Sequence, residues 1–329
     1  MKGIVSRLVA GVAVGVAVYV GFSIWAGVGP VKQALAAFTW WNLLFACLLA
    51  LGNYGVRFLR WQYYLGKVGV RVALGDSVMV FLAGFALTVT PGKLGEAVKA
   101  VLLRASHGIA MARTAPIVVA ERVTDLVALL LLALVGVFSF DVDKRFLIAG
   151  AALVVGGLAV VLVDPLARAA IRIAGRLPIL RRFAHRMEDF HAHTAALLAP
   201  GPLVVATALA SCSWFLECLA FWIVVRGFPS ASIGVREATF VYATTTVAGA
   251  LSFLPGGLGV TEAGMLALLR RLGQGIGQGT ALAATFVTRA ATLWFAVALG
   301  LPALVLYSRR KHVTIDADVS RRPDANGLP

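Results

Sequence analysis

Long apolar runs with few charges decide what this chain can fold into. Six of them lie near residues 5–27, 40–58, 115–138, 145–163, 201–226 and 279–306. A helix needs about 20 apolar residues to cross the hydrocarbon core of a bilayer. Hydrophobic residues make up 60% of the 329 positions and charged residues only 14%, and a soluble domain cannot bury that much apolar surface. The sequence therefore predicts an all-α polytopic membrane protein.

Two further apolar segments, about 76–105 and 236–271, are each interrupted near their middle by a similar motif. The first break reads TPGKLGE from Thr90 to Glu96, and the second break reads LPGGLGVTE from Leu254 to Glu262. Proline has no N–H to donate and glycine tolerates unusual dihedral angles, so both motifs suit a turn of the chain at membrane depth. The residues expected to make these turns are Pro91, Gly92, Gly95, Pro255, Gly256, Gly257 and Gly259. Irregular backbone is stable at that depth only where it is buried in protein or lines a wet cavity.

Basic residues between the runs predict how the chain is oriented. Placing both termini in the cytoplasm puts eighteen Lys and Arg residues inside, with Arg57 and Arg60 among them as loop residues, and seven outside. This count holds only if each interrupted segment enters and leaves on the same side, the first from the inside and the second from the outside. We therefore predict about six spanning helices plus two oppositely oriented re-entrant helical hairpins, which form an inverted repeat. A pair of ordinary proline-kinked helices is the alternative.

The domain organisation is expected to be simple. Residues 1–311 are predicted to form one integral membrane domain, and residues 312–329 form a polar stretch typical of a disordered cytoplasmic tail. The first apolar run is longer than the hydrophobic region of a secretory signal and lacks a small-x-small exit, so we expect it to remain as an anchor. The predicted location is the cytoplasmic (inner) membrane, crossed several times, with both termini in the cytoplasm.

The net charge of +15 does not indicate nucleic-acid binding, because the basic residues lie in short loops between apolar runs. Arg168, Arg172 and Arg176 recur at four-residue spacing, a pattern typical either of a basic interfacial helix or of a solvated connector. Anionic lipid headgroups are the more natural partners of such residues than nucleic acid.

Metal and redox chemistry find little support in the sequence. Cys47, Cys212 and Cys218 lie inside apolar runs, at spacings that match neither a zinc site nor a disulfide framework. The stretch EDFHAH, residues 188–193, gathers acids and histidines, but its spacing fits no standard metal motif. We therefore expect no metal and no cofactor.

Ionisable side chains inside the predicted spans need a partner or a purpose, because each costs about 2.5–3.5 kcal/mol on insertion scales. These residues, treated as an intramembrane charge network, are Glu121, Arg122, Asp125, Glu217 and Arg289. Arg122 lies three residues before Asp125, close enough on a helix to pair with it. The acids of this group either balance an arginine near the interface or pair with Lys93, Lys99 or Arg289 on other helices. A contact between Glu217 and Arg289 is also compatible with the sequence.

The residues around the two breaks are the candidate binding residues. A helix that starts at a break directs unpaired N–H groups toward it, which favours a phosphate or another anion. The candidates for substrate binding are Lys93, Glu96, Lys99, Thr261 and Glu262. Lys93 strengthens an anion site, and Glu96 or Glu262 can accept a hydrogen bond from a hydroxyl or an ammonium group. The alternative is that the two acids only stabilise the first turn of a helix through its dipole.

Four motifs taken together resemble a known family. They are FLRW at 58–61, TPGKLGE at 90–96, ERVTD at 121–125 and LPGGLGVTE at 254–262. In this order they resemble the lysylphosphatidylglycerol synthase transmembrane family, a flippase-like integral membrane domain, over nearly the whole chain. The resemblance implies that such a domain moves an aminoacylated phospholipid between leaflets, while a separate cytoplasmic domain makes that lipid from charged transfer RNA. This chain resembles only the membrane half, so synthase activity is not expected.

The leading functional prediction is lipid translocation: a phospholipid or lipid-linked headgroup crosses the membrane through a polar cavity between the two hairpins. One alternative is a membrane-embedded lipid transferase with Glu96 or Glu262 as its base. The sequence shows no metal-ligand set and no nucleophile paired with a base, which argues against an enzyme. Another alternative is an accessory subunit of a lipid, glycolipid or hopanoid synthesis pathway. The expected partners are an anionic or lipid-linked lipid, a lipid-synthesis enzyme and a second copy of the chain.

Overall fold

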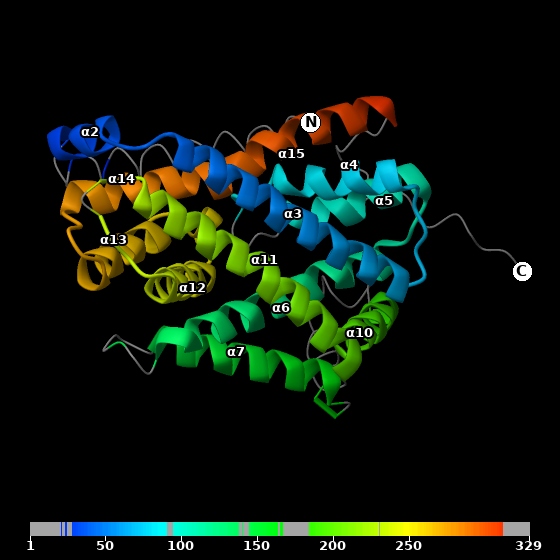
Figure 1. Cartoon of the computed structure of the whole chain (residues 1–329). Helices are drawn as coiled ribbons and strands as arrows, with labels where there is room; N and C mark the ends of the chain where they lie inside the picture. Colours follow the sequence, from blue (N-terminus) through cyan, green and yellow to red (C-terminus); the bar gives the residue numbers. More distant parts are fainter. Residues whose placement is uncertain are drawn as a thin grey trace, which may run out of the picture.

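The computed structural model describes residues 21, 24, 28–90, 95–137, 140, 145–163, 165–166, 184–229 and 231–311 (Figure 1). Within these residues the regular elements are helices, apart from one isolated β-bridge between Ser232 and Gln274. Four predictions fall outside the described residues. They concern most of the first apolar run, the turn at Pro91, Gly92 and Lys93, the basic residues Arg168, Arg172 and Arg176, and the tail 312–329.

Three helices among the described residues are long and apolar enough to cross a membrane. They are α3 (Trp41–Lys67), α11 (Pro200–Arg226) and the continuous helix Gln278–Arg310, which joins α14 (Gln278–Arg289), a π-helical turn (Ala290–Trp294) and α15 (Phe295–Arg310). Each covers one of the predicted spans. Helices α6 (Met111–Val137) and α7 (Arg145–Leu162) cover two more, and α6 has the same 27-residue length as α3 but carries three charges in its first half. The total number of spans stays a prediction.

Helix α3 corrects one sequence-based expectation. The predicted span stopped at residue 58 and placed Arg57 and Arg60 in a cytoplasmic loop, whereas the helix continues unbroken to Lys67. Both arginines are buried within it, with exposed fractions of 6% and 0%. The helix continues because acids on other helices balance these charges, so they do not need to reach water.

The two interrupted segments are each a helix, a break and a second helix. Helices α4 (Leu74–Phe85) and α5 (Val98–His107) flank the first break, and α12 (Val235–Leu251) and α13 (Val260–Leu272) flank the second. In the second break, Gly256, Gly257 and Gly259 have φ angles of 60°, 68° and 88°, a region that strongly favours glycine. The side of the membrane from which each segment enters stays a prediction.

In the first break, the Thr90 hydroxyl links backbone groups on the two sides of the interruption. It donates a hydrogen bond to the Leu87 carbonyl at 2.7 Å and accepts one from the Gly95 N–H at 2.7 Å. A β-carbon at Gly95 would lie 2.6 Å from that hydroxyl oxygen and 2.5 Å from the Leu87 carbonyl oxygen. Any larger residue would clash here, so this position requires glycine.

Helix contacts follow a twofold pattern that is compatible with an internal repeat. Figure 1 shows α3 and α11 side by side across the molecule, and these two helices are in extensive contact. Helix α4 packs on α15 while its counterpart α12 packs on α6, and likewise α5 packs on α6 while α13 packs on α14. The first helix of each interrupted segment thus packs on the long helix that follows the other segment, and the second helix packs on the one that follows its own segment. The remaining helices α2 (Val28–Ala36) and α10 (Ala184–Leu198) lie at the periphery, against α14 and against α6 and α11 respectively.

The two breaks meet. Val89, just before the first break, shares a small buried apolar cluster with Leu258 of the second break and with Leu293 and Val297 of the last long helix. A β-carbon placed on Gly256 would lie 3.6 Å from the Val89 Cα. Segments far apart in the sequence are therefore in van der Waals contact where the two interruptions lie.

Large apolar side chains cover much of the outer surface. On α3, Leu44, Leu48 and Leu51 are 44–52% exposed, and on α7 Ile148 and Val155 are 66% and 67% exposed. Such continuous apolar faces along long helices are unfavourable in water and normal in lipid.

Gly300 on α15 marks the closest approach between the first interrupted segment and the last long helix. A β-carbon there would collide with the backbone nitrogen of Ala86 and lie 2.7 Å from the Phe85 carbonyl carbon. Gly300→Ala is therefore expected to destabilise the protein by about 1–3 kcal/mol, because backbone atoms cannot rotate away. Gly55→Ala on α3 is the matched control: no atom lies within 4 Å of its added β-carbon, so its stability should equal or slightly exceed wild type. Thermal unfolding in detergent measures both; equal melting temperatures would contradict the close approach.

Candidate membrane-embedded site

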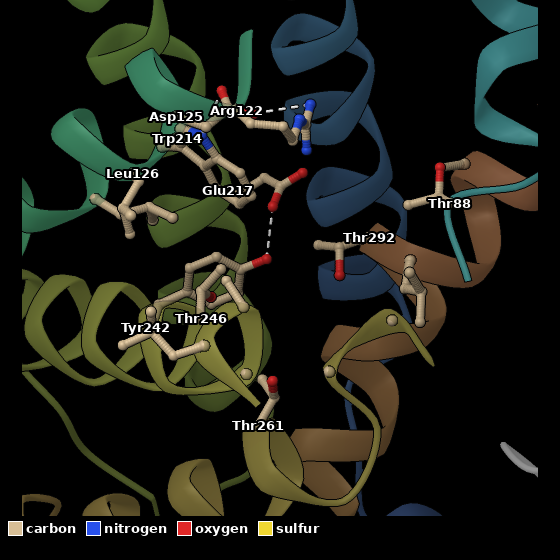
Figure 2. A pocket seen from close by; sticks show the side chains of 18 of the residues that line it. Thr88, Arg122, Asp125, Leu126, Trp214, Glu217, Tyr242, Thr246, Thr261 and Thr292 are labelled. Carbon is tan, nitrogen blue, oxygen red and sulfur yellow. Dashed lines mark hydrogen bonds and ion pairs between the residues drawn. The ribbon is translucent and has the colours of Figure 1, made fainter. Parts of the chain in front are cut away.

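A cavity of about 300 Å³ lies between the long helices and the second break (Figure 2). Its wall comes mainly from α3, α6, α11, α12, the π-helical turn and the second break, with single residues from α7, α13, α14, α15 and the approach to the first break. The polar side chains that line it are Tyr54, Arg57, Thr88, Arg122, Asp125, Trp214, Glu217, Tyr242, Thr246, Thr261, Arg289 and Thr292. Thr88 comes from the approach to the first break and Thr261 from the second, so the cavity lies where the two interrupted segments meet.

Local breaks in helix geometry shape this cavity. The π-helical turn Ala290–Trp294 widens the last long helix beside it, and such turns are frequent at functional sites. The Thr292 carbonyl in that turn accepts a hydrogen bond from the Tyr54 hydroxyl at 2.9 Å. Near the second break, the Thr261 hydroxyl lies where a β-carbon of Gly249 or Gly257 would stand, so two glycines make room for it.

A cluster of seven charged residues stands behind the first break, and we call it the first charge cluster. Its members are Arg57, Arg60, Glu96, Lys99, Glu121, Arg122 and Asp125. Four cations and three acids from α3, α5, α6 and the first break therefore balance one another almost completely. Burial of so many charges is tolerable only because they are paired.

Asp125 is the centre of one half of this cluster. One of its carboxylate oxygens lies 2.8 Å from Arg60 Nη2 and accepts a hydrogen bond from the Trp214 indole N–H at 3.0 Å. The other oxygen lies 2.9 Å from Arg122 Nη2, as the three-residue spacing predicts. Asp125 thus ties α6 to both α3 and α11.

Glu96 and Lys99 form the other half. Glu96 is 1% exposed and lies 3.0 Å from Arg122 Nη2 and 3.6 Å from Arg57 Nη2. Lys99 Nζ lies 2.5 Å from Glu121 and 4.6 Å from the centre of the Trp61 ring, so it combines an ion pair with a cation–π contact. Of the cross-helix pairings that the sequence left open, Glu121 thus pairs with Lys99, whereas Asp125 pairs with Arg60.

Arg289 and Glu262 form a second buried ion pair, at the second break. Arg289 Nε lies 2.7 Å from Glu262 Oε1, and Arg289 Nη2 donates to the Gly256 carbonyl at 2.6 Å. The other oxygen of Glu262 accepts the Gly259 N–H at 2.7 Å. Glu262 therefore both stabilises the start of α13 and anchors the arginine that holds the turn.

Glu217 differs from these acids. It is 6% exposed, lies in the middle of α11 and accepts a 2.6 Å hydrogen bond from the Tyr242 hydroxyl. Figure 2 shows its carboxylate inside the cavity between Tyr242 and Arg122, with one oxygen turned away from Tyr242. The contact with Arg289 that the sequence permitted is not made, since Arg289 pairs with Glu262.

The predicted binding residues take different places. Thr261 lines the cavity, whereas Glu96, Lys99 and Glu262 are buried behind its wall and pair with other charged residues. Lys93 lies outside the described residues. Their role in substrate binding stays a prediction.

Sequence reasoning missed several cavity residues. Arg57 was counted as a loop charge, and Tyr54, Trp214 and Tyr242 were not singled out. The signal for Arg57 was present in the sequence: the apolar and aromatic residues that follow it, FLRWQYYL, extend the run well past residue 58.

Long apolar helices around a charged interior cavity define a multi-spanning helical membrane protein with a membrane-embedded polar site. The chain belongs to the family described as the lysylphosphatidylglycerol synthase TM region, which it matches over residues 12–300. It is also similar to two proteins of Methanothermobacter thermautotrophicus (strain Delta H), each described as a UPF0104 membrane protein. One is 24% identical over 318 residues, which covers 89% of this chain and 93% of that protein. The other is 27% identical over 299 residues, 84% of this chain and 86% of that protein.

Proposed function

We propose that the protein moves a lipid headgroup across the cytoplasmic membrane through the cavity described above. One observation carries this proposal: the same cavity is charged inside and apolar at its edge. Arg57, Arg122 and Glu217 lie within it, while Phe253 and Leu254 of its wall are 66% and 43% exposed on the outside of the protein. A headgroup inside such a cavity keeps polar partners while its acyl chains stay in lipid.

Membership of a lipid-related membrane family supports this function. Guanidinium groups and threonine hydroxyls replace the water that a headgroup loses when it leaves the interface. Thr261 contacts the headgroup in this proposal, and Glu96, Lys99 and Glu262 act indirectly by fixing the two breaks. Both termini lie in the cytoplasm, as the distribution of basic residues predicts.

The contact between the breaks is where passage is controlled. The apolar cluster of Val89, Leu258, Leu293 and Val297 adjoins the cavity through Leu293, which lines it. The first helix of each interrupted segment packs on the long helix that follows the other segment, so a small rotation between the two halves moves both breaks together. In this proposal the cavity opens alternately to the two leaflets, the mechanism known for transporters built on inverted repeats.

Leaflet exchange in proteoliposomes tests the proposed function. Purified protein is reconstituted with a trace of lipid fluorescently labelled on its acyl chain, and a reducing agent that cannot cross the membrane quenches the outer leaflet. Protein-containing vesicles are expected to lose clearly more than the outer-leaflet half of the signal, whereas empty vesicles stop at half. The lipids are then extracted and weighed by mass spectrometry. Unchanged masses support translocation, while a new lipid product or exchange equal to empty vesicles would contradict it.

A further inference from the structure

Arg57 is a buried guanidinium that points into the cavity with most of its donors unused. It is 6% exposed, and its contacts among the described residues are Glu96 at 3.6 Å and the face of Phe85 at 5.1 Å. Neither is a hydrogen bond, and guanidinium groups at such burial normally make several. Its neighbour Arg122 binds Glu96 and Asp125 through the same nitrogen, Nη2. Two arginines thus offer N–H groups to the same part of the cavity.

Glu217 is a buried carboxylate that lacks a cationic partner among the residues that the structure describes. Of the five buried acids in the described part of the site, it is the one that makes no ion pair: Glu96, Glu121, Asp125 and Glu262 each lie within 3.0 Å of a cation. Its single hydrogen bond comes from Tyr242 and occupies one carboxylate oxygen. The second oxygen, turned away from Tyr242 in Figure 2, is left for a donor from outside the protein.

We infer that the cavity binds a zwitterionic lipid headgroup, with its phosphate on Arg57 and Arg122 and its ammonium group on Glu217. This inference rests on the proposed function and names its substrate class. A phosphate fits the arginine side because guanidinium groups form paired, charge-assisted hydrogen bonds with phosphate oxygens. An ammonium fits the carboxylate side because it brings both a positive charge and N–H donors.

A purely anionic headgroup fits this cavity less well. It satisfies the arginines but brings no positive charge to the Glu217 carboxylate, which then stays in a low-dielectric site beside a second anion. A purely cationic headgroup pairs with Glu217 but has no phosphate oxygens to accept hydrogen bonds from Arg57. Only a headgroup that carries both charges supplies both missing partners.

Binding of two lipids that differ only in the headgroup tests this inference. Short-chain phosphatidylethanolamine and phosphatidylglycerol with identical acyl chains are titrated into detergent-solubilised protein by calorimetry. Wild type is expected to bind the ethanolamine lipid at least about tenfold more tightly, the value of one charge-assisted hydrogen bond. Equal affinities, or tighter binding of the glycerol lipid, would overturn the inference.

Variants of Glu217 and Arg57 test which side chain binds the ammonium group and which binds the phosphate. Glu217→Gln keeps the acceptor for Tyr242 but lacks the charge, so it should weaken ethanolamine-lipid binding about tenfold, whereas glycerol-lipid binding should stay the same or become tighter. Arg57→Gln should weaken both lipids to a similar extent, because both carry a phosphate. Glu237→Gln, a change in an ion pair that is partly exposed, is the matched control and should alter neither. If Glu217→Gln weakens the binding of both lipids equally while its melting temperature stays at the wild-type value, Glu217 does not bind the ammonium group.

The binding experiment is independent of transport. Selective binding of the ethanolamine lipid without leaflet exchange would keep this inference and refute the proposed function. Leaflet exchange with a preference for the glycerol lipid would support the proposed function and refute this inference.

Discussion

A Glu262→Ala variant is expected to lose about 3–5 kcal/mol of folding free energy, the cost of breaking a buried ion pair by removing one partner. Glu262 is fully buried, and its two oxygens bind Arg289 Nε and the Gly259 N–H, both at 2.7 Å. Alanine removes the carboxylate that balances a guanidinium inside a membrane-spanning helix. It also removes the acceptor that stabilises the start of α13, so the second break loses two restraints at once.

Thermal or denaturant unfolding in detergent or bicelles measures this loss. The double variant Glu262→Ala/Arg289→Leu should recover more than half of it, because a buried ion pair replaced by apolar residues is often close to neutral. Glu237→Ala breaks a partly exposed pair at 3.5 Å and should cost less than about 1 kcal/mol. A double variant no more stable than Glu262→Ala would contradict the assignment of Glu262 as the counter-charge of Arg289.

A Thr246→Phe variant is expected to slow leaflet exchange strongly while the protein stays folded. Thr246 lines the cavity on α12, opposite the part of the wall that Thr292 and Thr88 form in Figure 2. It takes no part in the hydrogen bonds or ion pairs of the two charged groups described above, so its replacement leaves those restraints in place. A phenyl ring at this position occupies space that the headgroup needs and supplies no hydrogen-bond partner in return.

The helical class of the protein and the positions of both breaks could be predicted from the sequence. Apolar runs of span length and the repeated Pro-Gly-x-Leu-Gly motif are local signals, because they follow from the length of a helix across lipid and from backbone geometry. The pairing of Arg122 with Asp125 was also predictable, since both lie on one face of α6.

The partners of the other charges were not predictable, because they lie far apart in the sequence. Lys99 and Glu121 are 22 residues apart and Glu262 and Arg289 are 27 apart, and several other pairings were equally compatible with the sequence. The positions of Arg57 and Arg60 were also wrongly predicted because their partners lie far away in the sequence. A basic residue near the end of an apolar run normally reaches the interface, and only the fold reveals that acids on other helices hold these two inside the protein.

The burial of Glu96, Lys99 and Glu262 has a consequence for the mechanism. Charged residues at the breaks were the natural candidates for direct contact with a substrate, yet these three are buried behind the cavity wall and pair with other charged residues. The cavity instead presents Arg57, Arg122 and Glu217, which lie on the long helices. Rigid helices position charged groups more accurately than turns do.

If the headgroup passes through this cavity, an obstruction inside the cavity must slow leaflet exchange, and the exchange rates of two matched variants measure this effect. Thr246→Phe blocks the cavity, whereas Leu306→Phe adds a phenyl ring at a position that is 59% exposed on α15. Both are reconstituted at equal protein-to-lipid ratio after their melting temperatures have been checked. We expect exchange by Thr246→Phe to be slower by at least about tenfold and exchange by Leu306→Phe to remain within about twofold of wild type. Wild-type exchange by a folded Thr246→Phe protein would show that lipids cross by another route.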